Sequence, residues 1–231
     1  MFFDPTYLMF MIPAFLLMSA TSWYVKHAYD KWSRVRASSG LTGAQAAERL
    51  ISTGGLYGLS IRGVNGNLTD HYDPRNKTLF LSPGVAQVPS VASVAIAAHE
   101  LGHAMQDAEE YFPLKFRSAL VPIVNIGSNL GWVLILAGLF LRWVDLAWLG
   151  VLVFSGGALF ALATLPVEFN ASSRAKELLW QTGVIATEEE RRGVSAVLNA
   201  AALTYVAGLV TAVMQLLYYV MLVGGMGRRR S

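Results

Sequence analysis

The sequence contains no cysteine, which excludes disulfide bonds and zinc sites built on thiolates. Charged residues are also scarce: they make up 14% of the 231 residues, whereas about a quarter is usual. Hydrophobic residues make up 54%. The absence of cysteine agrees with a reducing compartment such as the cytoplasm, and the shortage of charge predicts that much of the chain lies in a membrane.

Long apolar runs are present, and four of them approach the ~20 residues that an α-helix needs to cross the hydrocarbon core. They extend over about residues 5–24, 118–141, 146–165 and 201–223. The first run has no basic residue ahead of it and no clear cleavage site after it, so we interpret it as a retained anchor and not as a signal peptide. A multi-pass membrane protein with four transmembrane helices is therefore expected.

The spans divide the chain into five parts. We expect an N-terminal anchor, a polar segment, a transmembrane hairpin, a second polar segment and a transmembrane helix with a basic tail, at residues 1–24, 25–117, 118–165, 166–200 and 201–231. Both polar segments then lie on one side of the membrane.

Basic residues near the spans predict which side that is, because Lys and Arg are retained in the cytoplasm. More of them flank the polar segments than the opposite ends of the spans, although the terminal GRRRS argues the other way. We expect the polar segments on the cytoplasmic face of the cell (inner) membrane. These flanking residues also explain the net charge of +3 without a nucleic-acid partner.

The polar segments contain signals for a sheet and for helices. Residues 56–82 carry two turn signals, NGN and DPRN, between runs of alternating character, and we expect a small antiparallel sheet of two or three strands. Ser90 then caps a helix that is expected to run to about Glu110. Thr187 and Glu190 have the form of a capping box at the start of a helix that continues into the fourth span.

One apolar run contains a cluster of polar residues. It reads AIAAHELGHAMQ and includes the pattern His-Glu-x-x-His, formed by His99, Glu100 and His103. Residues four apart lie on one face of an α-helix, so both imidazoles can bind one metal ion, and the pattern indicates Zn²⁺. Glu100 is placed to act as the general base on a water that the metal activates.

The alternative is that two histidines simply pack on a buried helix, since the pattern also occurs by chance. The eight residues before His99 contain only one polar residue, Ser93. Two histidines and a glutamate would be costly to bury there unless each polar group had a partner. A metal ion supplies that partner, so the sequence favours a metal site.

A catalytic zinc needs a third protein ligand and one open position. No histidine or aspartate extends the motif as HxxGxxH, which leaves His71, Asp73 and Glu168. Glu168 is favoured because it follows Pro166 at the start of a helical stretch, and an acidic residue so near a hydrophobic span needs a cationic partner. In the alternative, Glu168 is a surface carboxylate beside Arg174.

Three segments, AAHELGHAMQ, DHYDP and LPVEFNASSRA, resemble in order and spacing the YugP-like membrane zinc metallopeptidases, also called neutral zinc metallopeptidases. The resemblance covers nearly the whole chain. It implies a mainly α, multi-pass membrane protein with a gluzincin-like zinc peptidase core, and a third zinc ligand from the glutamate of PVEFxAS, here Glu168. Wider relatives carry Glu-x-x-x-Asp in this motif, whose aspartate orients a ligand histidine. Here Ser172 holds that position, so the role is weaker or is supplied elsewhere.

Two further residues have alternative roles. His71 can stabilise the oxyanion or bind substrate as a catalytic residue, or it can be a turn residue with a local hydrogen bond. Arg174 can pair with a carboxylate near the zinc or extend to the membrane surface. Because Glu168 follows the third span by only a few residues, the zinc is expected near the membrane surface and the substrates are expected to be membrane-associated polypeptides.

The expected function is therefore that of an integral-membrane zinc metalloendopeptidase. Two alternatives are a site-2-type intramembrane protease and a zinc-binding membrane scaffold or regulator without peptidase activity. The first is disfavoured because four polar residues follow the motif closely, which makes that helix too polar to cross a membrane. These residues are Gln106, Asp107, Glu109 and Glu110.

Overall fold

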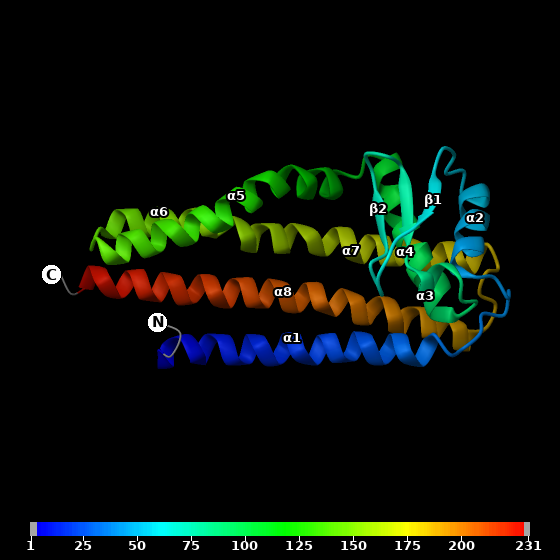
Figure 1. The fold of residues 1–231 in the computed structure, drawn as a ribbon, viewed down its shortest axis with the longest axis horizontal. Helices are drawn as coiled ribbons and strands as arrows, with labels where there is room; N and C mark the ends of the chain where they lie inside the picture. Colours follow the sequence, from blue (N-terminus) through cyan, green and yellow to red (C-terminus); the bar gives the residue numbers. More distant parts are fainter. Residues whose placement is uncertain (1–3, 229–231) are drawn as a thin grey trace. The chain divides into compact units, whose positions relative to one another are not determined.

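The computed structural model describes residues 4–228 (Figure 1). Arg229 and Arg230 of the predicted basic tail lie outside the described residues. The described helices are α1 (Pro5–Trp32), α2 (Gly43–Thr53), α3 (Pro83–Ala86), α4 (Val91–Ala108), α5 (Phe112–Phe140), α6 (Val144–Phe154), α7 (Gly156–Gln181) and α8 (Glu188–Arg228). Three short strands, β1 (Ser60–Gly63), β2 (His71–Asp73) and β3 (Thr78–Leu81), fall between α2 and α3 in the sequence. The predicted mainly α class is confirmed.

The chain forms two compact units, each built from segments that are far apart in the sequence. The membrane unit consists of Met1–Thr21, Lys115–Leu165 and Thr204–Ser231. The polar unit consists of Ser22–Leu114 and Pro166–Leu203. Helices α1, α5, α7 and α8 each contribute residues to both units.

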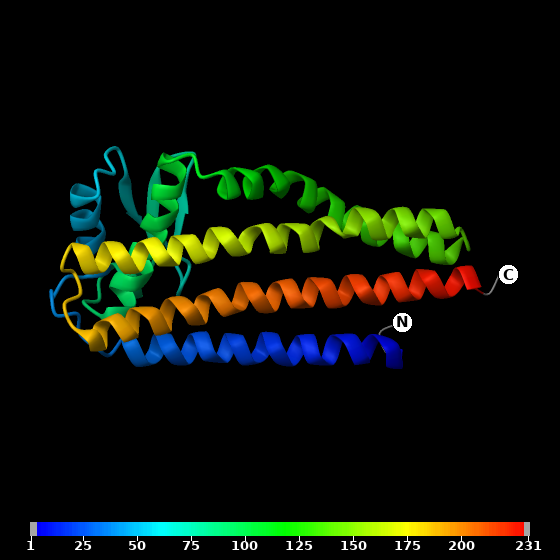
Figure 2. The same cartoon turned by 180° about the vertical axis from the view of Figure 1, so that it is seen from behind.

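The membrane unit draws on four helical stretches that are long and apolar enough to cross a bilayer. They are Pro5–Trp32, Phe112–Phe140, Val144–Gln181 and Glu188–Met226, so the prediction of four transmembrane helices is confirmed. The helices are longer than the predicted spans because polar residues continue them past the apolar runs. In this unit α6 lies beside the second half of α5 (Figures 1 and 2), and a Cβ on Gly150 would come within 2.5 Å of the Ile135 nitrogen. Only glycine permits so close an approach.

The sheet lies in the polar unit and differs in one respect from the prediction. Its strand order is β1-β3-β2, with β2 antiparallel to β3 but β1 parallel to β3. The NGN turn does reverse the chain after β1, as expected. However, the connection 64–70 places β2 one strand's width away from β1. The DPRN turn then brings β3 back between β1 and β2, where it pairs with both. The prediction of a wholly antiparallel sheet is therefore wrong, and β1 and β2 are the two edge strands, with β3 between them.

Helix α4 lies at the centre of the polar unit. Ser90 caps it through a 3.1 Å hydrogen bond from the Ser93 backbone nitrogen, and the helix ends at Ala108, two residues before the predicted end. Most of its apolar residues are buried against α2, the sheet and α7, and Ile96 and Met105 are partly buried. A Cβ on Gly102 would lie 2.5 Å from the Ala171 carbonyl oxygen, so the backbones of α4 and α7 touch at that point. This contact brings the two halves of the site together.

Candidate metal centre

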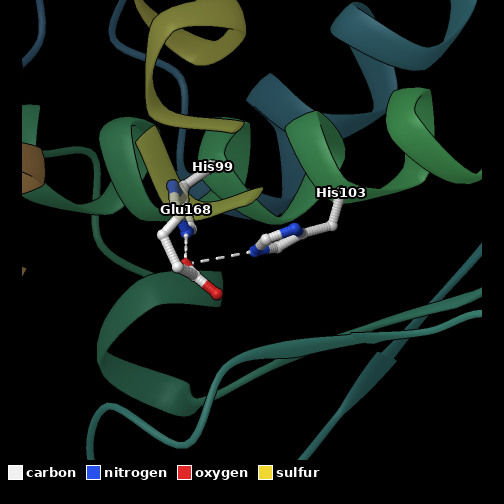
Figure 3. A group of neighbouring side chains, drawn as sticks. All are labelled: His99, His103 and Glu168. Atoms are coloured by element: carbon white, nitrogen blue, oxygen red, sulfur yellow. Dashed lines mark hydrogen bonds and ion pairs between the residues drawn. The ribbon is translucent and has the colours of Figure 1, made fainter. Parts of the chain in front are cut away.

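Helices α4 and α7 bring three side chains from the sequence prediction to one point (Figure 3). His99 and His103, one turn apart on α4, both direct their Nε2 atoms at Glu168 of α7. The Nε2 atoms lie 3.3 and 3.5 Å from Glu168 Oε2, respectively. The imidazole rings are nearly perpendicular, at 83°, and Glu168 is 3% exposed. A carboxylate so deeply buried needs a cationic partner.

The spacing of these atoms fits a zinc ion. For tetrahedral zinc with bonds of about 2.0–2.1 Å, neighbouring ligand atoms are about 3.3 Å apart. The three residues offer ligand atoms that all lie within 4.8 Å of one another. Two imidazoles and a carboxylate are also the ligand set of one class of catalytic zinc sites, which leaves the fourth position for water.

The outer nitrogen of each histidine has a hydrogen-bond partner, which fixes the orientation of the rings. His99 Nδ1 lies 3.2 Å from Ser172 Oγ, and His103 Nδ1 lies 3.0 Å from Gln106 Oε1. With both Nδ1 atoms protonated and donating, both Nε2 lone pairs point at the place where a metal would bind. Ser172 therefore occupies the place that the resemblance assigned to an aspartate, and its hydroxyl contacts the ligand.

Gln106 is a residue that the sequence analysis did not assign to the site. Its side chain is fully buried, and its Nε2 donates to the Val167 carbonyl oxygen at 2.8 Å and to Asn170 Oδ1 at 2.9 Å. It thus joins His103 to the turn of α7 that carries Glu168. A signal was present in the sequence, because positions 99, 103 and 106 follow the i, i+4, i+7 spacing of one helix face.

Arg174 extends this network to the surface. It donates to Asn170 Oδ1 at 2.7 Å and forms a two-pronged ion pair with Glu109, at 2.6 and 2.7 Å. Of the two predicted roles for Arg174, pairing with a carboxylate is the one observed. The partner is Glu109 at the end of α4, and Glu168 is not the surface carboxylate beside Arg174 that the alternative interpretation required.

The acidic residues around His103 raise the pKa of its imidazole. Burial lowers the pKa of His103, but the hydrogen bond and charge of Glu168, together with the charge of Glu100, outweigh burial and raise the pKa above its ordinary value. These neighbours therefore favour positive charge at this point, whether it comes from a proton or from a metal ion. Glu100 follows His99 on α4 and is partly exposed, so water can reach its carboxylate.

The other predicted residues lie elsewhere. His71, in β2, is exposed, stacks on Phe80 at 4.8 Å between ring centroids, and its Nδ1 lies 2.9 Å from the Thr69 carbonyl oxygen. This is the local hydrogen bond of the second interpretation, and a catalytic role for His71 stays a prediction. Asp73 accepts hydrogen bonds from the Arg75 nitrogen and the Asn76 side chain, as expected for a turn residue.

Comparison with known proteins agrees with this geometry. A family model described as "Putative neutral zinc metallopeptidase" matches residues 7–224. The chain belongs to this family. A curated relative, the "Putative membrane protease YugP" of Bacillus subtilis (strain 168), is 45% identical over 198 residues, which cover 86% of this chain and 88% of the relative. No solved structure matches the chain. The resemblance noted in the sequence is therefore confirmed.

Proposed function

We propose that this protein is an integral-membrane, zinc-dependent metalloendopeptidase that hydrolyses peptide bonds in membrane-associated or near-membrane polypeptides. The main support is the convergence of the His99, His103 and Glu168 ligand atoms, which all lie within 4.8 Å of one another, on two helices of which one also carries Glu100. The four apolar helices and the membrane protease relative support a membrane location. We further propose the cell (inner) membrane, with the site on the cytoplasmic face, from the distribution of Lys and Arg.

The proposed chemistry divides between the metal and the protein. A zinc ion held by His99, His103 and Glu168 would lower the pKa of a water molecule and polarise the peptide carbonyl. The Glu100 carboxylate accepts the proton of the attacking water and passes it to the amide nitrogen of the leaving group. His71 Nδ1 donates to the Thr69 carbonyl oxygen, so the Nε2 of the neutral ring can accept a hydrogen bond from a backbone N–H of the substrate.

The proposal is tested by the Glu100→Gln variant, purified and assayed on casein and on a membrane-anchored peptide. Removing the general base should lower kcat by about 10²–10⁴-fold, while zinc content stays at about one per chain because Glu100 is not a ligand. Glu48→Gln is the matched control, since Glu48 is an exposed carboxylate on α2. Full turnover in Glu100→Gln would exclude the proposed mechanism.

The same variant separates the peptidase from the alternative functions. A zinc-binding scaffold or regulator should keep its cellular function in Glu100→Gln, whereas a peptidase should lose it. The site-2-type alternative requires the motif inside a membrane span. Among the described residues, the four helical stretches able to cross a bilayer do not include α4, which disfavours that alternative.

A further inference from the structure

An open cavity of about 420 Å³ lies in the membrane unit, and none of the three candidate zinc ligands lines it. Helices α5, α6, α7 and α8 all contribute to its wall. The wall combines three polar side chains with aromatic and small residues: Ser128, Asn129, Trp132, Phe154, Gly157, Ala158, Ala212 and Gln215. Polar residues within membrane spans are expensive and usually functional.

The polar groups of this cavity have unused hydrogen-bonding capacity. Asn129 Nδ2 donates to the Asn125 carbonyl oxygen at 3.3 Å, and Gln215 Nε2 makes a long contact of 3.5 Å with the Tyr219 hydroxyl. Among the described residues, no donor reaches either amide oxygen, and the Ser128 hydroxyl has no partner. In hydrocarbon such groups are costly unless a ligand satisfies them.

The depth of the cavity limits what that ligand can be. Asn129 lies at the middle of the predicted span 118–141, and Gln215 and Gly157 lie within about one helical turn of the middle of theirs. A lipid headgroup lies about 15 Å from the middle of a bilayer, so it does not reach these amides. A charged ligand is disfavoured as well, because no charged side chain lines the cavity to neutralise it.

We propose that this cavity binds a transmembrane helix that carries a neutral hydrogen-bonding side chain, such as Asn, Gln, Ser or Thr, near its middle. The small residues Gly157, Ala158 and Ala212 let the backbone of such a helix approach closely, and the amides of Asn129 and Gln215 bond its polar side chain. Identifying the bound helix as part of the substrate rests on the proposed peptidase function. The membrane unit would then select membrane proteins by a polar residue within a span.

The binding test uses the Glu100→Gln protein, so that no cleavage occurs, in phosphatidylcholine vesicles. The probes are two fluorescent model helices of alternating Leu and Ala, one with a central Asn and one with Leu in its place, and energy transfer reports binding. We expect the Asn helix to bind about threefold to tenfold more tightly, as typical interhelical hydrogen bonds allow. Asn129→Leu and Gln215→Leu should each reduce the ratio of the two affinities toward one. A double-mutant cycle over the protein residue and the helix residue measures this coupling.

Asn125→Leu is the matched control, because Asn125 is an exposed amide one turn earlier on α5 that does not line the cavity. It should leave the ratio unchanged. Equal binding of the two helices, or a ratio that survives both cavity substitutions, would overturn the proposal. So would a change in oligomeric state in the cavity variants without a change in helix binding, because the occupant would then be a second copy of the chain.

The outcome for this site is independent of the outcome for the peptidase. Cleavage of a polypeptide that carries the Asn helix is measured separately, with the protein that retains Glu100. Helix selection without cleavage would leave the binding site intact and remove the proposed enzymatic function. Cleavage without helix selection would support the proposed enzymatic function and remove the proposed helix-binding site.

Discussion

At the scale of single residues, the two histidines of α4 are held by different partners, and neither partner is the aspartate of the wider relatives. A serine hydroxyl contacts His99, whereas a buried amide contacts His103 and also bonds α7. Such outer partners are important for metal affinity because they fix the tautomer and the ring orientation. Gln106 therefore positions a ligand and also tightens the contact between the two helices.

Substitutions of Gln106 can separate these two roles. Gln106→Met keeps the size of the side chain but removes every hydrogen bond, so zinc affinity should fall by about 10–100-fold. Gln106→Glu keeps an acceptor for His103 Nδ1 but cannot donate to Val167 or Asn170. It should retain zinc affinity while losing thermal stability. Competition with a chelating dye measures affinity, and exposed Gln87→Met is the control. Unchanged affinity in Gln106→Met would contradict this role.

At the scale of secondary-structure elements, local pattern predicted more than long-range pairing did. The motif helix and its Ser90 cap follow from residues a few positions apart, and so does the face shared by His99 and His103. The parallel pairing of β1 with β3 joins strands that are not consecutive in the sequence. No short-range pattern indicates which of the two later strands pairs with β1. Glu168 was favoured from its position after Pro166, but its approach to α4 depends on the absence of a side chain at Gly102.

The first turn of helix α8 contains the capping box that the sequence predicted, formed by Thr187 and Glu190. The Glu190 carboxylate also binds residues outside this box. Glu190 accepts hydrogen bonds from the backbone nitrogens of Ala186 and Thr187, from the Thr187 hydroxyl, and from the Ser38 nitrogen and hydroxyl. This first turn precedes the apolar run 201–223 of α8. Burial alone would raise the pKa of Glu190, but these hydrogen bonds outweigh it and lower the pKa to about 2.

The Glu190 carboxylate should therefore stabilise the fold in a defined pH range. Because its pKa is lower in the folded protein than the ordinary value of 4.5, its contribution is complete above about 4.5 and is lost as pH falls toward 2. Glu190→Gln should reduce the free energy of unfolding by about 1–3 kcal/mol at neutral pH, as measured by denaturant unfolding in detergent. Its neighbour Glu189→Gln, an exposed carboxylate, is the control. A difference from wild type that stays constant from pH 7 to pH 2 would contradict this assignment.

At the scale of the whole molecule, every candidate zinc ligand belongs to the polar unit, although α7 also contributes to the membrane unit. The absence of cysteine makes the orientation of the polar unit directly testable, because any thiol signal comes from an introduced residue. Asn67 is exposed in the polar unit, and Arg142 is exposed in the turn between α5 and α6. The predicted topology places these two positions on opposite sides of the bilayer.

A membrane-impermeant thiol reagent applied to cells should label Arg142→Cys from outside the inner membrane. Asn67→Cys should react only after the membrane is opened, because the positive-inside rule places the polar unit in the cytoplasm. The cysteine-free wild type is the control for background labelling. Labelling of Asn67→Cys in intact membranes, with Arg142→Cys protected, would reverse the proposed orientation.

The central claim is that two histidines of α4 and one glutamate of α7 hold a single zinc ion. Metal analysis of the purified full-length protein, beside His99→Ala and Glu168→Ala, tests it most directly. We predict about one zinc per chain in the wild type and almost none in either variant, because removal of one of three ligands weakens binding steeply. A wild type without zinc after growth in zinc-supplied medium, or a Glu168→Ala variant that keeps its full zinc content, would contradict the account.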